Sequence, residues 1–191
     1  MTKLLSVDLR RDIPAPDAAP DLGDLHRLFD IGSVRVNSGS RFDSRWGDVR
    51  IEVRDDKERP PGLTDFFQTV PFAVISKSFA KLLERFGCAA ELLPLQVRYR
   101  RKWMIGDYFA LNVLAVVDDA VDRGRSKFAS YDAGPLEEVE HLELNDAVLA
   151  AHPVAYLREV CCLAVSDTLA AEILAAGLRG VKLSSPQEFR S

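Results

Sequence analysis

The chain has 191 residues, of which 47% are apolar and 28% are charged, and its formal net charge is −4. The apolar fraction is large enough for a hydrophobic core, which excludes a wholly disordered chain. Because arginine is spread along the sequence without forming a basic block, we expect no nucleic-acid partner. No signal peptide is apparent and no apolar run is long enough to span a bilayer, so we expect a cytoplasmic protein without membrane contact.

Residues 1–65 predict a strand and a loop-rich segment ahead of a core at residues 66–191, with both parts in one compact domain. Residues 3–8 alternate weakly between apolar and polar side chains, which favours a short strand. Closely spaced prolines in residues 13–20 favour an extended loop. The leucines of residues 21–30 are spaced as on one side of a short helix.

The rest of the N-terminal segment predicts a strand between two loops. Residues 34–48 are rich in Gly, Ser, Asn and Asp, which is typical of a loop, and Trp46 is its only large anchor. Residues 49–54 alternate between branched apolar and charged side chains, which predicts a half-buried strand. A charged turn that contains two adjacent prolines is expected at residues 55–62.

One strand–helix pattern occurs twice in the core. In residues 72–87 and again in residues 164–177, a branched apolar run ends at a serine, a helical pattern follows, and a glycine stands eleven positions after the serine. We expect Ser76 and Ser166 to cap the two helices by accepting a hydrogen bond from a free N–H, and the glycines to end them. The repeat predicts a strand–helix–strand duplication in which both helices cover a sheet.

The other core elements are expected to be strands joined by turns. Residues 108–117 are almost all apolar and are the best candidate for a central strand. Residues 118–126 indicate a polar turn, and residues 186–191 a loose tail. Further strands are expected at residues 92–100, 127–131, 139–144, 156–165 and 181–184, with one helical turn at residues 147–151. The predicted fold is therefore α+β, with a mixed, largely antiparallel sheet and two capped helices.

No complete catalytic or metal-binding motif is apparent. The three histidines stand far apart, and no nucleophile elbow, zinc-binding helix or phosphate-binding loop occurs. Cys88, Cys161 and Cys162 have neither a C-x-x-C spacing nor a neighbouring histidine, and the last two lie in an expected buried strand. We expect reduced, packed thiols and no cofactor.

Three aspartates follow directly on the expected central strand. Asp118, Asp119 and Asp122 stand where an α/β protein can hold Mg²⁺ or a substrate, which predicts a metal-dependent enzyme acting on a small phosphorylated or nucleotide substrate. The alternative is a solvated turn whose aspartates accept backbone N–H groups. The neighbouring Arg123 and Arg125 favour this alternative, because they can neutralise the charge.

Two runs of charge are candidate surfaces. Residues 98–103 combine three arginines and a lysine with Tyr99 and Trp103, which resembles a nucleic-acid patch but is more typical of the wet side of a strand and its turn. An acidic edge is expected farther along the chain, where such charge also discourages pairing between sheet edges. It consists of Glu137, Glu138, Glu140 and Glu143.

Three pieces of the sequence between Phe66 and Leu183 carry a resemblance to a known family. They are residues 71–76 with their helix and residues 92–95; residues 108–114 with the polar run to Ser126; and residues 156–158 followed by residues 163–166, their helix and residues 177–181. In order and spacing they resemble an immunity-protein family of bacterial polymorphic toxin systems, long described as a domain of unknown function. The family often has phenylalanine before the arginine of the third piece, where this chain has Leu157.

The resemblance implies a small protein that binds one cognate toxin domain in the producing cell and blocks it, without turnover or cofactor. The family's recurrent polar positions fall on Asn112, Asp118, Asp122, Ser126 and Arg158. For these residues both toxin contact and a structural role stay open: Asp122 and Ser126 can fix a turn, and Arg158 can pair with a buried carboxylate.

Exposed loops are the expected toxin-facing surface, namely residues 33–47, 55–61 and 132–145. The acidic edge can meet a basic toxin such as a nuclease. The leading hypothesis is therefore an immunity protein, the metal-dependent enzyme is its alternative, and the oligomeric state stays open.

Overall fold

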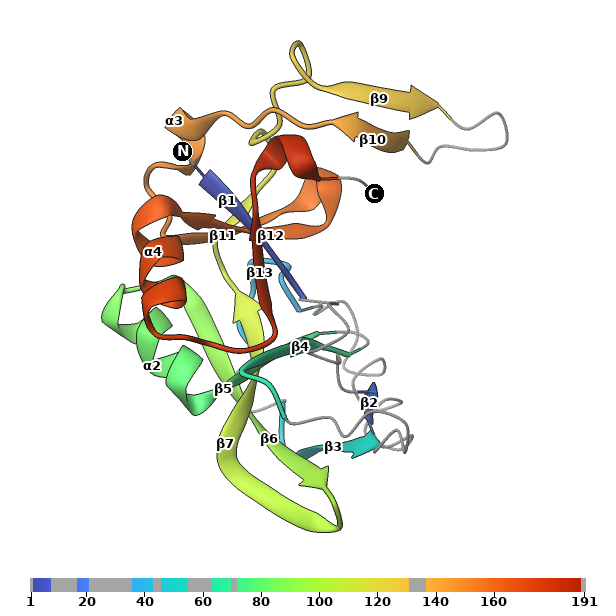
Figure 1. The fold of residues 1–191 in the computed structure, drawn as a ribbon, viewed down its shortest axis with the longest axis vertical. Helices are drawn as coiled ribbons and strands as arrows, with labels where there is room; N and C mark the ends of the chain where they lie inside the picture. Colours follow the sequence, from blue (N-terminus) through green and yellow to red (C-terminus); the bar gives the residue numbers. More distant parts are fainter. Residues whose placement is uncertain are drawn as a thin grey trace.

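The strands fall into three sheets in the computed structural model, which describes residues 2–7, 17–20, 36–42, 46–54, 63–69, 72–130 and 137–189. The predicted α+β class is confirmed, because the sheets are mixed and largely antiparallel and helices lie against them (Figure 1). The larger sheet has six strands in the order β2 (Asp17–Pro20), β3 (Val49–Arg54), β6 (Ala90–Tyr99), β7 (Lys102–Val113), β5 (Ala73–Ser76) and β4 (Phe66–Gln68).

The second sheet joins the two ends of the described chain. Its N-terminal strand lies between two C-terminal strands, so segments from both predicted parts of the chain share hydrogen bonds. Its order is β13 (Val181–Ser184), β1 (Thr2–Val7), β12 (Cys162–Ser166), β11 (Val154–Leu157) and β8 (Val116–Val117). A separate antiparallel ribbon is formed by β9 (Lys127–Ser130) and β10 (Glu137–His141).

The two predicted capped helices are present as α2 (Lys77–Arg85) and α4 (Asp167–Ala175). The hydroxyl oxygens of Ser76 and Ser166 each accept a hydrogen bond at 3.3 Å from the backbone N–H three residues on. The glycines that follow the helices have φ of +60° and +62°, the left-handed conformation that ends a helix. The local geometry of both copies is therefore as expected, while their origin by duplication stays a prediction.

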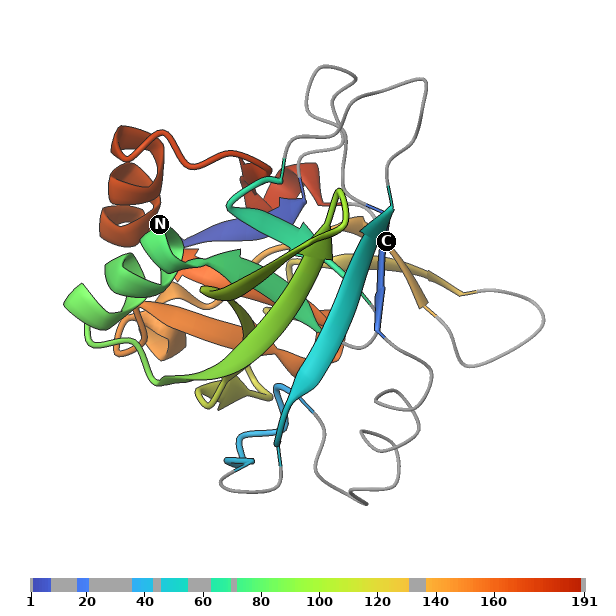
Figure 2. The same ribbon diagram turned by 90° about the horizontal axis from the view of Figure 1, so that it is seen from below.

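Helix α2 packs on β5 and β7 of the six-stranded sheet, and α4 packs on β12 and β1 of the five-stranded sheet. The helices lie side by side in both views (Figures 1 and 2). One core cluster fills the space between the helices and the two sheets. A second lies on the other face of the six-stranded sheet and contains Trp46, which is 2% exposed and donates its indole N–H to the Pro94 carbonyl at 2.8 Å. The predicted anchor is confirmed.

The predicted central strand is divided between two sheets. Strand β7 does lie inside the six-stranded sheet, but it begins at Lys102 and ends at Val113, and β8 then joins β11 in the other sheet. The ladder stops because a side chain takes the place of the next strand partner: the Val113 N–H donates to Asn37 Oδ1 at 2.7 Å. An all-apolar run does not reveal such a crossing, since both of its halves are buried.

Two other expectations need correction. The adjacent cysteines are not both in a strand, because Cys161 is exposed and left-handed, with φ of +50°, between η2 (Arg158–Val160) and β12. The tail is not loose over its described part, because the 3₁₀ helix η3 (Pro186–Glu188) begins with a capping box formed by Ser185 and Glu188.

The remaining strands lie near their expected positions, and the predicted helical turn appears as α3 (Asp146–Leu149). The predicted helix at residues 21–30 and the charged turn at residues 55–62 lie outside the described residues. Within the described part of the chain, no helix has both the length and the apolar character needed to cross a bilayer.

Candidate functional site

Four of the five predicted polar residues meet around one loop. Asp118, Asp122 and Ser126 lie in the polar loop, residues 118–126, between β8 and β9, and Arg158 reaches the loop from η2. Asn112 lies apart, in β7 of the six-stranded sheet. The structure therefore separates the predicted set into a surface loop and a buried residue, which we consider in turn.

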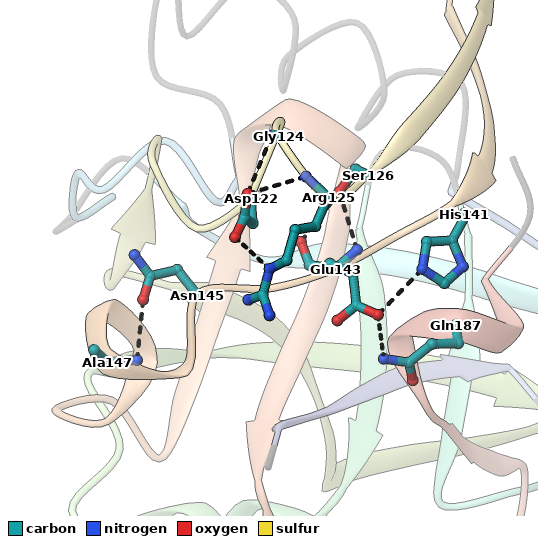
Figure 3. A network of polar contacts seen from close by, with 9 residues as sticks. All are labelled: Asp122, Gly124, Arg125, Ser126, His141, Glu143, Asn145, Ala147 and Gln187. Carbon is teal, nitrogen blue, oxygen red and sulfur yellow. Dashed lines mark hydrogen bonds and ion pairs between the residues drawn. The ribbon is translucent and has the colours of Figure 1, made fainter.

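Asp122 organises the first half of the turn (Figure 3). Its Oδ1 accepts the backbone N–H groups of Gly124 and Arg125 at 3.1 and 3.2 Å, and its Oδ2 accepts the Arg125 Nε–H at 2.7 Å. These contacts, of which the Arg125 side chain is the strongest, lower the pKa of the Asp122 carboxyl below its usual value. The alternative prediction of a self-capped, neutralised turn is confirmed for Asp122.

Ser126 attaches the loop to the segment after β10. Its hydroxyl donates to the Glu143 carbonyl at 3.2 Å and accepts the Glu143 N–H at 3.0 Å, while the Asp122 N–H donates to the same carbonyl at 2.9 Å (Figure 3). Ser126 thus supplies the hydrogen bonds of a missing strand residue, and its role in the structure is to hold two chain segments together.

The Glu143 side chain turns toward the C-terminal end of the chain. Its Oε1 lies 3.1 Å from Gln187 Nε2 and 3.1 Å from His141 Nε2 (Figure 3). The Gln187 amide, followed by His141 and Arg125, lowers the pKa of the Glu143 carboxyl. Of the expected acidic edge, Glu143 is therefore engaged within the chain and Glu140 is exposed. The side chains of Glu137 and Glu138 lie outside the described residues.

Helix η2 clamps the other side of the polar loop. The Arg158 guanidinium contacts Asp118 at 3.0 Å, but both side chains are more than half exposed, so the buried partner expected for Arg158 is wrong. Sequence reasoning missed the neighbouring Glu159, which accepts the Val121 N–H at 3.2 Å and the Arg123 Nε–H at 3.1 Å. No local pattern predicts this pairing, because 36 residues separate Arg123 from Glu159.

The three aspartates do not converge on one point. The carboxylates of Asp118 and Asp122 face Arg158 and Arg125, and Asp119 is exposed. Across the described ranges there is no group of three or more His, Cys, Asp or Glu side chains placed to hold a metal ion. A metal-dependent enzyme stays a prediction, and calorimetry can test it.

Asn112 is 0% exposed and ties a loop to the inside of the fold. Its Oδ1 accepts the Asn37 N–H at 2.8 Å, and its Nδ2 donates to the Ser40 carbonyl at 2.9 Å and to Glu91 Oε2 at 3.0 Å. Glu91 in turn accepts the Phe42 N–H at 2.9 Å. Asn112 therefore stabilises residues 37–42 against β7, and its burial prevents contact with a partner.

A second clip that the sequence did not indicate centres on Asp65. Its Oδ1 accepts the Ser76 hydroxyl at 2.6 Å and its Oδ2 accepts the Arg179 N–H at 2.9 Å, so it links the first capped helix to the loop before β13. The next residue, Gly180, has φ of +82°, and an added Cβ would lie 2.3 Å from the Phe66 carbonyl oxygen. A side chain cannot be accommodated at Gly180.

The surface has a groove and a projecting hairpin. The groove, of about 410 Å³, lies between α2 and α4, and an ion pair between Arg85 and Glu172 crosses it. The hairpin is formed by β6 and β7 and lies at the opposite end of the molecule from the β9–β10 ribbon (Figure 1). It carries two exposed large apolar side chains, Trp103 at 49% and Ile105 at 73% exposure. A third, Leu174, lies on α4.

Comparison of the chain with protein-family models finds no match, and a search of curated proteins finds no relative. Function is therefore inferred from the geometry of the chain and from the resemblance described above.

Proposed function

We propose that this protein is an immunity protein, which binds a cognate polymorphic toxin domain in the cytoplasm of the producing cell and neutralises it by stoichiometric binding. The observation that carries the proposal is the projecting β6–β7 hairpin with its exposed Trp103 and Ile105. Exposed apolar side chains gathered on one element are typical of a protein–protein interface, and tryptophan is enriched among the residues that dominate binding.

The predicted polar residues support the same proposal through their engagement within the chain. Asp122, Ser126 and Arg158 hold the polar loop, and Asn112 holds a buried loop. Residues that fix the shape of a surface serve a protein that acts by presenting that surface.

Co-expression tests the proposal. The toxin domain encoded beside this gene is produced in a bacterial host with and without this chain, and we expect growth only when the chain is present. The purified proteins should also form a complex of fixed stoichiometry, which light scattering after size exclusion measures. If the toxin still kills cells in which this chain is abundant, the proposal is wrong.

The metal-dependent alternative has its own test. Titration calorimetry with Mg²⁺ and Mn²⁺ compares the wild-type chain with Asp122→Asn. Binding of either ion that is lost in the variant would favour the enzyme. Under the immunity proposal we expect no difference between the two proteins.

A further inference from the structure

One face of the six-stranded sheet is left without a covering layer. In the ladder, Arg98 stands opposite Trp103, Gln96 opposite Ile105, and Glu52 of β3 beside Arg98. Residues paired in this way point to the same side of a sheet. The opposite side carries Ile51, Val53 and Val97, which are buried in the second core cluster. We call the side with Arg50, Glu52, Gln96, Arg98, Trp103 and Ile105 the open face.

The open face continues a buried surface. Leu111 and Phe109 lie on the same side of β7 as Ile105 and belong to the core beneath α2 or pack against it. A bulge at residues 106–107 adds two residues and so preserves this alternation. Along β7, exposure rises from Leu111, which is 1% exposed, to Ile105, which is 73% exposed. The apolar stripe therefore runs out from under α2 to the end of the hairpin.

The charge around this stripe is positive. Arg50, Arg98, Arg100, Arg101 and Lys102 surround it, whereas Glu52 and Asp107 are its nearby carboxylates. The chain as a whole has a formal net charge of −4, so this end opposes the overall sign. Complementary charge speeds encounter and fixes orientation, which makes an acidic surface the matching partner.

The turn that carries two of these arginines has an unusual backbone. Arg100 and Arg101 have φ of +48° and +64°, in a two-residue hairpin loop where asparagine and glycine are preferred. Non-glycine residues in this conformation are concentrated at sites where function requires them. The turn thus presents two basic side chains at the tip of the hairpin at a cost to stability.

The chemistry favours a protein over a nucleic acid. The Arg98 guanidinium lies 5.8 Å from the centroid of the Trp103 ring and so covers one ring face that a base would need. Glu52 Oε1 lies 3.6 Å from Arg98 NH1, where it repels phosphate. Ile105, the most exposed large apolar side chain among the described residues, needs an apolar partner surface.

We infer that the open face is the surface on which the toxin domain docks, through a toxin patch that is apolar at its centre and acidic around it. This inference rests on the proposed function. It places the interface on the β6–β7 hairpin and away from the acidic edge of the β9–β10 ribbon.

Titration calorimetry between the full-length chain and the toxin domain encoded beside its gene tests the inference. We expect Trp103→Ala combined with Ile105→Ser to weaken binding by about thirtyfold or more, as loss of a central contact does. Arg101→Glu, which leaves the apolar centre intact, should weaken binding by about tenfold and reduce its salt dependence. The matched control is Leu174→Ser, which removes an exposed apolar side chain from α4 and should leave affinity unchanged.

The outcomes are distinguishable. If the wild-type chain does not bind the toxin domain, the proposed function fails. If the wild-type chain binds but both hairpin variants bind equally well, the proposed function stands and the docking surface is elsewhere. Fluorescence anisotropy with a single-stranded RNA probe is measured in parallel: binding of RNA by the wild type that Trp103→Ala abolishes would overturn the protein partner. Far-UV circular dichroism verifies that each variant is folded.

Discussion

Replacing the central residues of the β6–β7 turn, by Arg100→Asn together with Arg101→Gly, tests whether this turn stores strain. At φ of +48° and +64° the Cβ atoms of both arginines crowd the following carbonyl oxygens, which costs about 1–2 kcal/mol per residue. Asparagine and glycine adopt this conformation readily, and together they form a preferred loop for a two-residue hairpin. Relief of strain is therefore expected to contribute about 2–3 kcal/mol.

Two effects offset part of this gain. The Arg100 guanidinium lies 5.2 Å from the centroid of the Tyr99 ring, and loss of an exposed cation–π contact costs about 0.5–1 kcal/mol. Glycine also increases the entropy of the unfolded chain, which costs about 0.5–1 kcal/mol. The net expectation is an increase of about 1 kcal/mol in the free energy of unfolding, which raises Tm by about 2–4 °C for a chain of this size.

Urea unfolding followed by circular dichroism measures the effect. We expect a higher midpoint with an unchanged dependence of stability on urea concentration, because the surface exposed on unfolding stays the same. Arg100→Ala is the control: it removes the contact with Tyr99 but keeps a non-glycine residue at positive φ, so it should lower stability by about 0.5–1 kcal/mol. A double variant that is no more stable than the wild type would refute the argument from strain.

Three further predictions concern the inside of the fold and the polar loop. Gly180→Ala should lower the free energy of unfolding by about 2 kcal/mol or more, since the new methyl group meets the Phe66 carbonyl oxygen; urea unfolding measures this loss. Asn112→Ala should cost about 2–4 kcal/mol by leaving buried hydrogen-bonding groups unpaired, and equal stability in thermal unfolding would contradict the role assigned to Asn112. Because the folded-state pKa of Glu143 is lowered, the stability it contributes is present above the ordinary value of 4.5 and is lost as the pH falls through the lowered value. Glu143→Gln should therefore unfold with a weaker acid dependence in a pH series of urea titrations.

The elements that were predictable from sequence depend on neighbouring residues. Ser76 and Ser166 cap their helices through a backbone N–H only three residues away, so the cap is visible in the order of side chains. The alternation in β3 also predicts a half-buried strand, because successive side chains point to opposite faces. The self-capped turn of Asp122 and Arg125 belongs to the same class, since its partners lie within three residues.

The polar contacts that place these elements relative to one another were not predictable. Asp65 binds the Arg179 N–H across 114 residues, and Asn112 binds the Asn37 N–H across 75 residues. In each case the sequence shows only a common polar residue, and its partner becomes a neighbour when strands far apart in the chain pair. The buried location of Asn112 is an example, because its polar side chain alone suggested a surface position.

The sequence by itself determined the α+β class, the two capped helices and the anchoring of Trp46, because capping, alternation and burial of a large apolar side chain follow from local chemistry. Only the tertiary structure decided that Trp103 and Ile105 are exposed. The side of a strand that remains in contact with water depends on where α2 packs on the sheet, and this position is set by contacts between elements that are distant in the sequence.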